Sequence, residues 1–374
     1  VAEFGEDVAD GTDLVVWDQV EYANFSMPLS DSDKNPTMFL DSLLPRIMTL
    51  AESSSDRKTK SAACELLHGV ILLCVAGTHQ ATKVKHDIFK QLFPCILRLS
   101  VDADVIPQQL FGPLTKQLIH WYTKDSNVAM ADAELLLESI LEATCHPTAG
   151  NLRESAAAAL AEFLKYALKT KKRKSRHNHD ADGTPLGADM LLKRLFQLAR
   201  HPDPYRRIGS ALAFTRIYRL FRDDQNLVGE YLFQCIDEYL VSLKMSYMDS
   251  TVLSASELTL EVIKHLQKIV ILQIKHIEDV RTIRKQLTSL MERLLQNCGS
   301  YENTPSAYRK ACADLFFAVV RDMYDDENAC NYTPQSFLQE WGGLRLNDDP
   351  DGPRTATAQL IGLFEKNESD SRLP

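Results

Sequence analysis

Residues 259–277 read TLEVIKHLQKIVILQIKHI, and their apolar positions decide the fold class. Most large aliphatic side chains recur here at spacings of three and four: Leu260, Val262, Ile263, Leu266, Ile269, Val270, Ile274 and Ile277. An α-helix has about 3.6 residues per turn, so this spacing places them along one helical face. The stretch therefore predicts an amphipathic helix with one buried side.

The same periodicity covers most of the chain, and no convincing run of alternating strand residues interrupts it. Similar stripes occupy residues 38–52, 57–77, 83–101, 104–123, 130–145, 151–169, 188–200, 204–221, 225–246, 279–297 and 304–324. Asp56, Asn151 and Asp203 stand where a helix cap would accept backbone amide hydrogen bonds. Only residues 14–17 suggest a short extended piece. We expect about ten to thirteen helices, on the stripe count.

A short motif also recurs, with a basic residue, a small residue three positions later and a third position on the same face. Its copies are Lys60-Ala63-Leu66, Arg153-Ala156-Ala159, Arg206-Gly209-Leu212 and Arg309-Cys312-Leu315. Their separations fit units of about 47–53 residues, near the ~40–47 of HEAT and armadillo repeats. The motif predicts an all-α fold, an α-solenoid of HEAT-like antiparallel helix pairs, with each small residue facing a neighbouring helix.

Three segments follow from these patterns. Residues 1–37 are expected to be an extended N-terminal segment, residues 38–325 the helical-repeat array, and residues 326–374 a weakly patterned C-terminal segment. Within the array, residues 170–187 (TKKRKSRHNHDADGTPLG) are polar and aperiodic, which predicts an exposed, mobile basic loop.

Composition excludes several classes of protein. The 374 residues are 45% hydrophobic and 25% charged, with a net charge of −9, so the chain can bury a core and is not a basic nucleic-acid coat. No apolar stretch is long enough for a bilayer span, and no signal sequence opens the chain, so no membrane partner is expected. The first residue, Val1, indicates a fragment or a processed chain. We expect an intracellular protein whose eight cysteines are reduced and structural.

The sequence carries none of the common catalytic signatures. The sequence has no phosphate-binding loop, no dinucleotide fingerprint, no nucleophile elbow and no zinc-protease histidine pair. His68, His120 and His265 fall beside apolar helical residues, which favours packed or surface histidines over catalytic bases. We therefore expect no catalytic, cofactor-binding or metal-binding residue in this segment.

The basic run is the strongest local charge feature. It contains Lys171, Lys172, Arg173, Lys174 and Arg176. Three interpretations stay open: a nuclear-import signal, a contact with nucleic-acid phosphates, and a solvated connector. No aromatic residue interleaves the run, which argues against a stacking platform for single strands.

Several stretches resemble the family of DNA-dependent protein kinase catalytic subunits, which are phosphoinositide-3-kinase-related kinases. They are residues 44–47 (LPRI), 55–68 (SDRKTKSAACELLH), 117–121 (QLIHW), 191–195 (LLKRL) and 211–219 (ALAFTRIYR). The resemblance is to the family's middle helical-repeat region. It implies a nuclear serine/threonine kinase of non-homologous end joining, recruited to DNA ends by the Ku heterodimer. The kinase domain lies outside this chain.

Three hypotheses about function follow. The chain could be a scaffold segment that positions the DNA/Ku-binding and kinase parts, with other regions of the same polypeptide as partners. Alternatively it is an independent α-solenoid adaptor that binds proteins, or an enzyme with an unrecognised site. A scaffold segment should expose apolar end faces, because solenoids need capping repeats. An adaptor should be soluble and monomeric by itself.

Overall fold

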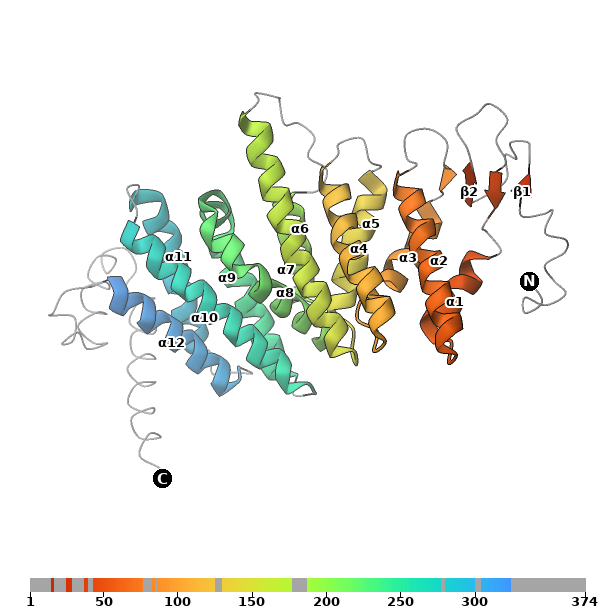
Figure 1. Cartoon of the computed structure of the whole chain (residues 1–374). Helices are drawn as coiled ribbons and strands as arrows, with labels where there is room; N and C mark the ends of the chain where they lie inside the picture. The colour runs from red at the N-terminus through yellow and green to blue at the C-terminus, as the bar shows by residue number, and fades with distance from the viewer. Residues whose placement is uncertain are drawn as a thin grey trace, which may run out of the picture. The chain divides into compact units, whose positions relative to one another are not determined.

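The computed structural model describes residues 15–16, 25–28, 37–39, 43–76, 83–84, 86–124, 130–176, 187–249, 251–276, 280–299 and 304–323. Twelve helices lie within these residues; Figure 1 labels them along the chain. They are α1 (Leu44–Ser53), α2 (Arg57–Ala76), α3 (His86–Leu99), α4 (Val105–Lys124), α5 (Met130–Thr144), α6 (Gly150–Arg176), α7 (Ala188–Ala199), α8 (Pro204–Asp223), α9 (Gln225–Met248), α10 (Leu253–His276), α11 (Val280–Gly299) and α12 (Ser306–Met323). The all-α class predicted from the stripes is confirmed.

The chain divides into two compact units, residues 1–191 and 192–374. In the first unit the helices form the pairs α1/α2, α3/α4 and α5/α6. The first helices, α1, α3 and α5, pack in one layer, and the second helices, α2, α4 and α6, pack in another. Each helix therefore contacts its own partner and the equivalent helix of the next pair, which is how a HEAT-like repeat buries its core.

The second unit repeats this arrangement. Helix α9 packs against α10, and α11 against α12, while α8, α10 and α12 follow one another as second helices. Phe196 of α7 and Tyr231 of α9 bring the first helices together, with ring centroids 6.4 Å apart. Within the described residues of both units, no helix is long and apolar enough to cross a membrane.

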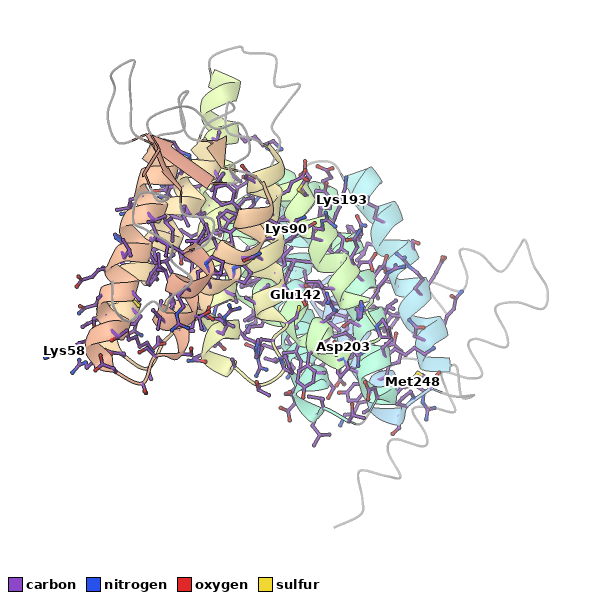
Figure 2. The ribbon with its side chains drawn as sticks, turned by 90° about the vertical axis from the view of Figure 1, so that its right-hand side faces the viewer. Lys58, Lys90, Glu142, Lys193, Asp203 and Met248 are labelled. Carbon is purple, nitrogen blue, oxygen red and sulfur yellow. The ribbon has the colours of Figure 1, made fainter. Side chains whose placement is uncertain are left out.

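Side chains fix several helix starts. Asp56 Oδ2 accepts from the Thr59 amide at 2.9 Å and so caps α2. Asp203, labelled in Figure 2, caps α8 through the Tyr205 amide at 2.9 Å. These two predicted caps are confirmed. Asn151 also accepts from a backbone amide, that of Leu152 at 3.0 Å, but it lies one residue inside α6, which begins at Gly150.

A small sheet was not predicted from the sequence, although the short extended piece expected at residues 14–17 contains its first strand. Its strands are β1 (Val15–Val16), β2 (Phe25–Pro28), β3 (Thr37–Phe39) and β4 (Lys83–Val84). They pair antiparallel in the order β1-β3-β2-β4. Strands of two to four residues are too short to display an alternating pattern, so periodicity could not reveal them. Residues 324–374, including the predicted weakly patterned tail, lie outside the described residues.

The recurring motif is correct in outline and wrong in register at two places. Ala156, Gly209 and Cys312 are buried in second helices, as the motif predicted. Leu66, however, is 53% exposed, and the buried face of α2 runs through Cys64 and Leu67. In the α8 copy the buried basic residue is Arg207 rather than Arg206. A spacing rule cannot distinguish Arg206 from the adjacent Arg207. Which of the two is buried depends on where α8 begins and how it packs.

Candidate functional site: the basic end of α6 and the bridges between helix pairs

Helix α6 carries the whole basic run. The loop predicted for residues 170–187 is wrong for its first part, because α6 continues to Arg176. Lysine and arginine are good helix formers, and cations stabilise the last turn of a helix by interacting with its dipole. The five predicted site residues, Lys171, Lys172, Arg173, Lys174 and Arg176, therefore lie on helical backbone. Lys171 is exposed; the side chains from 172 onward, and residues 177–186, lie outside the described set.

The last part of α6 extends past its neighbour α4. Thr170 Oγ1 donates to the carbonyl oxygen of Thr123 at 3.4 Å, one residue before α4 ends at Lys124. Six residues of α6 follow Thr170, which at 1.5 Å per residue is about 9 Å of helix. Figure 1 shows this end of α6 projecting beyond α4 and α5. The basic run thus begins where the packing of α6 against α4 stops.

A pair of stacked aromatic rings lies just before this projecting end of α6, between α6 and α4. The ring of Tyr166 lies against the ring of His120 of α4, with centroids 3.6 Å apart, and Lys169 Nζ lies 5.0 Å from the Tyr166 centroid. Glu162 Oε1 is 3.4 Å from His120 Nε2, and Glu162 also pairs with Lys165 at 3.2 Å. Burial raises the pKa of Glu162, but Lys165 and His120 together outweigh this and lower it. The carboxyl group of Glu162 is therefore ionised at neutral pH.

Sequence reasoning missed Tyr166 because it looked for aromatic residues inside the basic run. On a helix, Tyr166 and Lys169 are three residues apart and therefore face the same side. That spacing was the signal that could have found the pair. The stack orients Lys169 at the edge of the α4–α6 contact.

A second kind of contact joins successive helix pairs. We call it an inter-pair bridge: a basic residue early in a second helix binds an aspartate in the loop of the next pair. Lys60 Nζ of α2 binds Asp102 between α3 and α4, at 3.0 and 2.8 Å. Arg207 Nη2 of α8 binds Asp249 between α9 and α10, at 2.9 Å. Both bridges tie the start of one second helix to the turn before the next.

Arg207 is the more deeply enclosed of the two basic residues. Its side chain is 1% exposed, and its Nε donates to Ser246 Oγ at 3.0 Å. Its Nη1 donates to the carbonyl oxygens of His201 and Pro202, at 3.0 and 2.6 Å. A buried charge is tolerated only when its donors are satisfied, and here one guanidinium holds together a turn, a helix and the next loop.

Arg153 in α6 repeats part of this arrangement. Its Nη1 donates to the carbonyl oxygens of His146 and Pro147, at 2.8 and 3.0 Å. The turns before α6 and α8 therefore share a His-Pro sequence whose carbonyls bind an arginine on the following helix. The first helices of the second unit are linked as well: Arg200, which directly follows α7, pairs with Glu238 of α9, and Arg293 of α11 pairs with Asp237 of α9.

The histidines and cysteines take part in packing. His68 makes an edge contact with Phe111 and His265 stacks on Tyr218; burial lowers the pKa of both histidines. The described free cysteines are all buried: Cys64, Cys95, Cys145, Cys235 and Cys312. Burial raises the pKa of the Cys64 and Cys312 thiols to about 11, so they stay protonated and poorly nucleophilic. Within the described residues, no cluster of three or more His, Cys, Asp or Glu side chains could hold a metal ion.

The described part of the chain therefore offers mechanical coupling and positive charge. Two bridges, one in each unit, link a helix pair to the pair that follows it, and Lys171 is exposed near the end of α6. Both properties suit a protein segment that holds other segments of a larger protein in position.

Known proteins place the chain in a family. A family model described as DNA-dependent protein kinase catalytic subunit, CC1/2, matches residues 83–367. The DNA-dependent protein kinase catalytic subunit of Gallus gallus is 36% identical over 262 residues, which is 68% of this chain and 6% of the relative. That of Canis lupus familiaris is 32% identical over 325 residues, covering 82% and 8%. That of Dictyostelium discoideum is 34% identical over 249 residues, covering 66% and 6%.

These relatives are much longer than the chain, which spans 6–8% of their length. The match runs through most of the helical pairs described above, from β4 to beyond α12. The helical stretches quoted from the sequence pointed to the same family. The chain thus belongs to the family of DNA-dependent protein kinase catalytic subunits, as a segment corresponding to their CC1/2 region.

Proposed function

We propose that this chain is a non-catalytic scaffold segment of a nuclear serine/threonine kinase that acts in DNA double-strand break repair by non-homologous end joining. It positions the DNA- and Ku-binding parts of that polypeptide relative to the kinase part. The observation that carries the proposal is the family match over residues 83–367, combined with bridges that connect successive helix pairs.

The bridges support a positioning role through the mechanics of repeat proteins. In a helical array each pair contacts only its neighbours, so a displacement at one end reaches the other through the contacts between pairs. Lys60–Asp102 and Arg207–Asp249 hold two of those contacts by charge-assisted hydrogen bonds in addition to apolar packing. A chain built this way transmits small rotations along the array.

The non-catalytic part of the proposal is tested with the isolated chain. Purified to homogeneity, it should show no ATP turnover and no transfer of phosphate to a peptide substrate. ATP turnover that a substitution within the chain abolishes would contradict the proposal. Light scattering of the same sample separates the scaffold from an independent adaptor: a cut-out segment should self-associate, whereas an adaptor should be monomeric.

The basic end of α6 favours an additional electrostatic role. Its helix already projects into solvent, so its cations can attract a polyanion without the backbone first having to be ordered. Sequence-independent binding to nucleic acid should weaken steeply as salt rises. Use as an import signal in an extended conformation would require these residues to leave the helix.

One set of substitutions separates the roles of this basic end. Alanine at Lys171, Lys172, Arg173 and Lys174 removes four charges and retains a strong helix former at each position. A polyanion contact predicts loss of salt-sensitive binding, and an import signal predicts that a fluorescent fusion leaves the nucleus. If neither changes, this end of α6 is a solvated connector.

A further inference from the structure

Prolines interrupt both helices of the second pair. Pro94 lies inside α3, and Pro113 lies inside α4. A proline has no backbone N–H, so the carbonyl oxygens of Lys90 and Gln109, four residues earlier, lack their usual partners within the helix. Sharp bends in helices are found mainly at such positions. Each helix of this pair can therefore bend at a defined residue.

No other described helix has a proline in its interior. The remaining prolines of the described helices are Pro45, Pro107 and Pro204, which lie in the first turns of α1, α4 and α8. The first four N–H groups of a helix have no partner within it, so these three prolines remove no helical hydrogen bond. The interruption is thus confined to α3 and α4, which form the middle pair of the first unit.

The two prolines lie near the same level of the pair. Helices α3 and α4 are joined by the turn of residues 100–104 and pack against each other. Pro94 is five residues before the end of α3, and Pro113 is eight residues after the start of α4. At 1.5 Å per residue these positions are about 8 and 12 Å from the turn, which differ by less than one helical turn. Both helices can therefore bend along one line across the pair.

The turn between α3 and α4 is bound to the helix pairs on both sides of it. Three ion pairs connect it to the first pair: Arg98–Glu52 at 2.7 Å, Lys60–Asp102 at 2.8 Å and Arg57–Asp104 at 3.4 Å. On the other side, Asn151 Nδ2 of α6 donates to the carbonyl oxygen of Val101 at 3.2 Å. We call residues 95–112 the turn end of the pair. These contacts fix the turn end relative to α1, α2 and the start of α6.

The rest of the pair, residues 86–93 and 114–124, is its distal end. On the side of α6, the distal end carries the contact between the rings of His120 and Tyr166. On the side of the first pair, α1 has 10 residues and α2 has 20. At 1.5 Å per residue, α1 extends about 15 Å from its turn with α2, whereas α2 extends about 30 Å. The distal half of α2 therefore lies beyond α1, and its Leu72 is 40% exposed.

We propose that the second pair is a hinge of the first unit. Bending of α3 at Pro94 and of α4 at Pro113 lets the distal end move together with α6, away from the distal half of α2. Helix α6 then pivots about its first turn, while the turn end of the second pair stays in place. A hinge needs a few residues that absorb a change in backbone angles, and the two prolines supply them. This inference concerns the first unit alone and does not rest on the function proposed above.

Distances between spin labels on α2 and α6 test the hinge in the whole chain. The labels are attached through a noncanonical amino acid, which leaves the cysteines untouched. One pair, at Leu72 and Lys165, reports on the distal end; the other, at Ala62 and Ala158, reports on the turn end. All four residues are exposed. Double electron–electron resonance should give a narrow distance distribution for the turn-end pair and a broader one, which extends to longer distances, for the distal pair.

Restoring the helical hydrogen bonds should remove this motion. Pro94→Ala together with Pro113→Ala supplies both missing N–H groups, so the longer distances should disappear and the distal distribution should become as narrow as the turn-end one. Pro45→Ala, in the first turn of α1, restores no helical hydrogen bond and is the matched control; it should leave both distributions unchanged. Asp102→Asn removes the charge that binds Lys60, and should broaden the turn-end distribution.

Three results would overturn the hinge. The distal distribution of the parent chain could be as narrow as the turn-end one, the double variant could keep the longer distances, or Pro45→Ala could remove them as well. Circular dichroism checks that each variant retains its helices. Should the double variant misfold, Pro113→Ala alone decides the question, because in this account α4 separates from α2 only by bending at Pro113.

Discussion

The hydroxyl of Tyr239 in α9 lies 3.0 Å from Ser210 Oγ in α8, inside the core of the second unit. The same hydroxyl donates to the Ser210 carbonyl oxygen at 3.2 Å, and Ser210 Oγ donates to the Leu195 carbonyl oxygen of α7 at 2.8 Å. Both side chains are fully buried. Three helices are therefore joined by a short hydrogen-bonded chain, and burial raises the pKa of Tyr239 so that the phenol stays protonated.

Tyr239→Phe should destabilise the second unit by about 1–2 kcal/mol, because it removes the buried hydrogen bonds between the phenol and Ser210 while the bond from Ser210 Oγ to the Leu195 carbonyl remains. Urea unfolding followed by circular dichroism measures the change. Tyr247→Phe, in the same helix but half-buried, is the matched control and should shift stability by less than about 0.5 kcal/mol. Equal effects from the two substitutions would mean that the Ser210 contact contributes nothing.

Arg207→Met should cost about 3 kcal/mol or more. It leaves the carbonyls of His201 and Pro202 without the guanidinium, and removes the partner of Asp249. Arg219→Met, on the exposed side of the same helix, should be close to neutral. Lys60→Met should lie between them, at about 1 kcal/mol, because the Lys60–Asp102 pair is partly exposed to solvent. Thermal denaturation orders the three, and an Arg207→Met midpoint equal to that of Arg219→Met would contradict the bridge.

Two glycines should respond in opposite directions. Gly209 is buried within α8, so Gly209→Leu should overpack its contact and cost about 1–3 kcal/mol. Gly229 of α9 is exposed, and a Cβ there would meet no atom within 4 Å. Gly229→Ala should therefore stabilise the helix by about 0.5–1 kcal/mol. Melting temperatures check both, and a Gly229→Ala protein that melts lower than the parent would show that this surface is covered.

His265 should make stability depend on pH. Burial against Tyr218 lowers its pKa, with a smaller lowering by Lys268 that Glu261 opposes. The unfolded chain then binds the proton more readily than the folded chain, so this contribution is present above pH ~6.5 and is lost as the pH falls below it. His265→Gln should flatten the pH profile of unfolding between about pH 7 and 5. An unchanged profile would mean that His265 titrates as an exposed histidine.

The sequence predicted the parts of this fold that depend on periodicity. Stripes such as residues 259–277 located the helices, and the caps at Asp56 and Asp203 located two of their starts. Spacing could not decide between Arg206 and Arg207, because only the three-dimensional path of α8 buries one of them. The inter-pair bridges were also hidden, since a contact over forty-two residues leaves no local pattern.

The candidate site, too, could be predicted only in part from the sequence. The basic run was found from composition, but its conformation was predicted wrongly because low apolar periodicity was read as a loop. Lysine and arginine sustain a helix by propensity without any buried stripe, and α6 continues to Arg176 for that reason. The support from Tyr166 and His120 arises from the packing of α6 on α4, which lie far apart in sequence.

The most direct test of the scaffold role uses the full-length kinase with Arg207→Met and Asp249→Asn, and Arg219→Met as its control. Basal peptide phosphorylation and stimulation by Ku and DNA ends are measured on the same preparations. If this segment positions the other parts, the double variant keeps its basal rate and its binding to Ku and DNA ends, but loses most of the stimulation, while the control keeps all three. Full stimulation in the double variant, with exchange measurements confirming that the bridge is broken, would contradict the account.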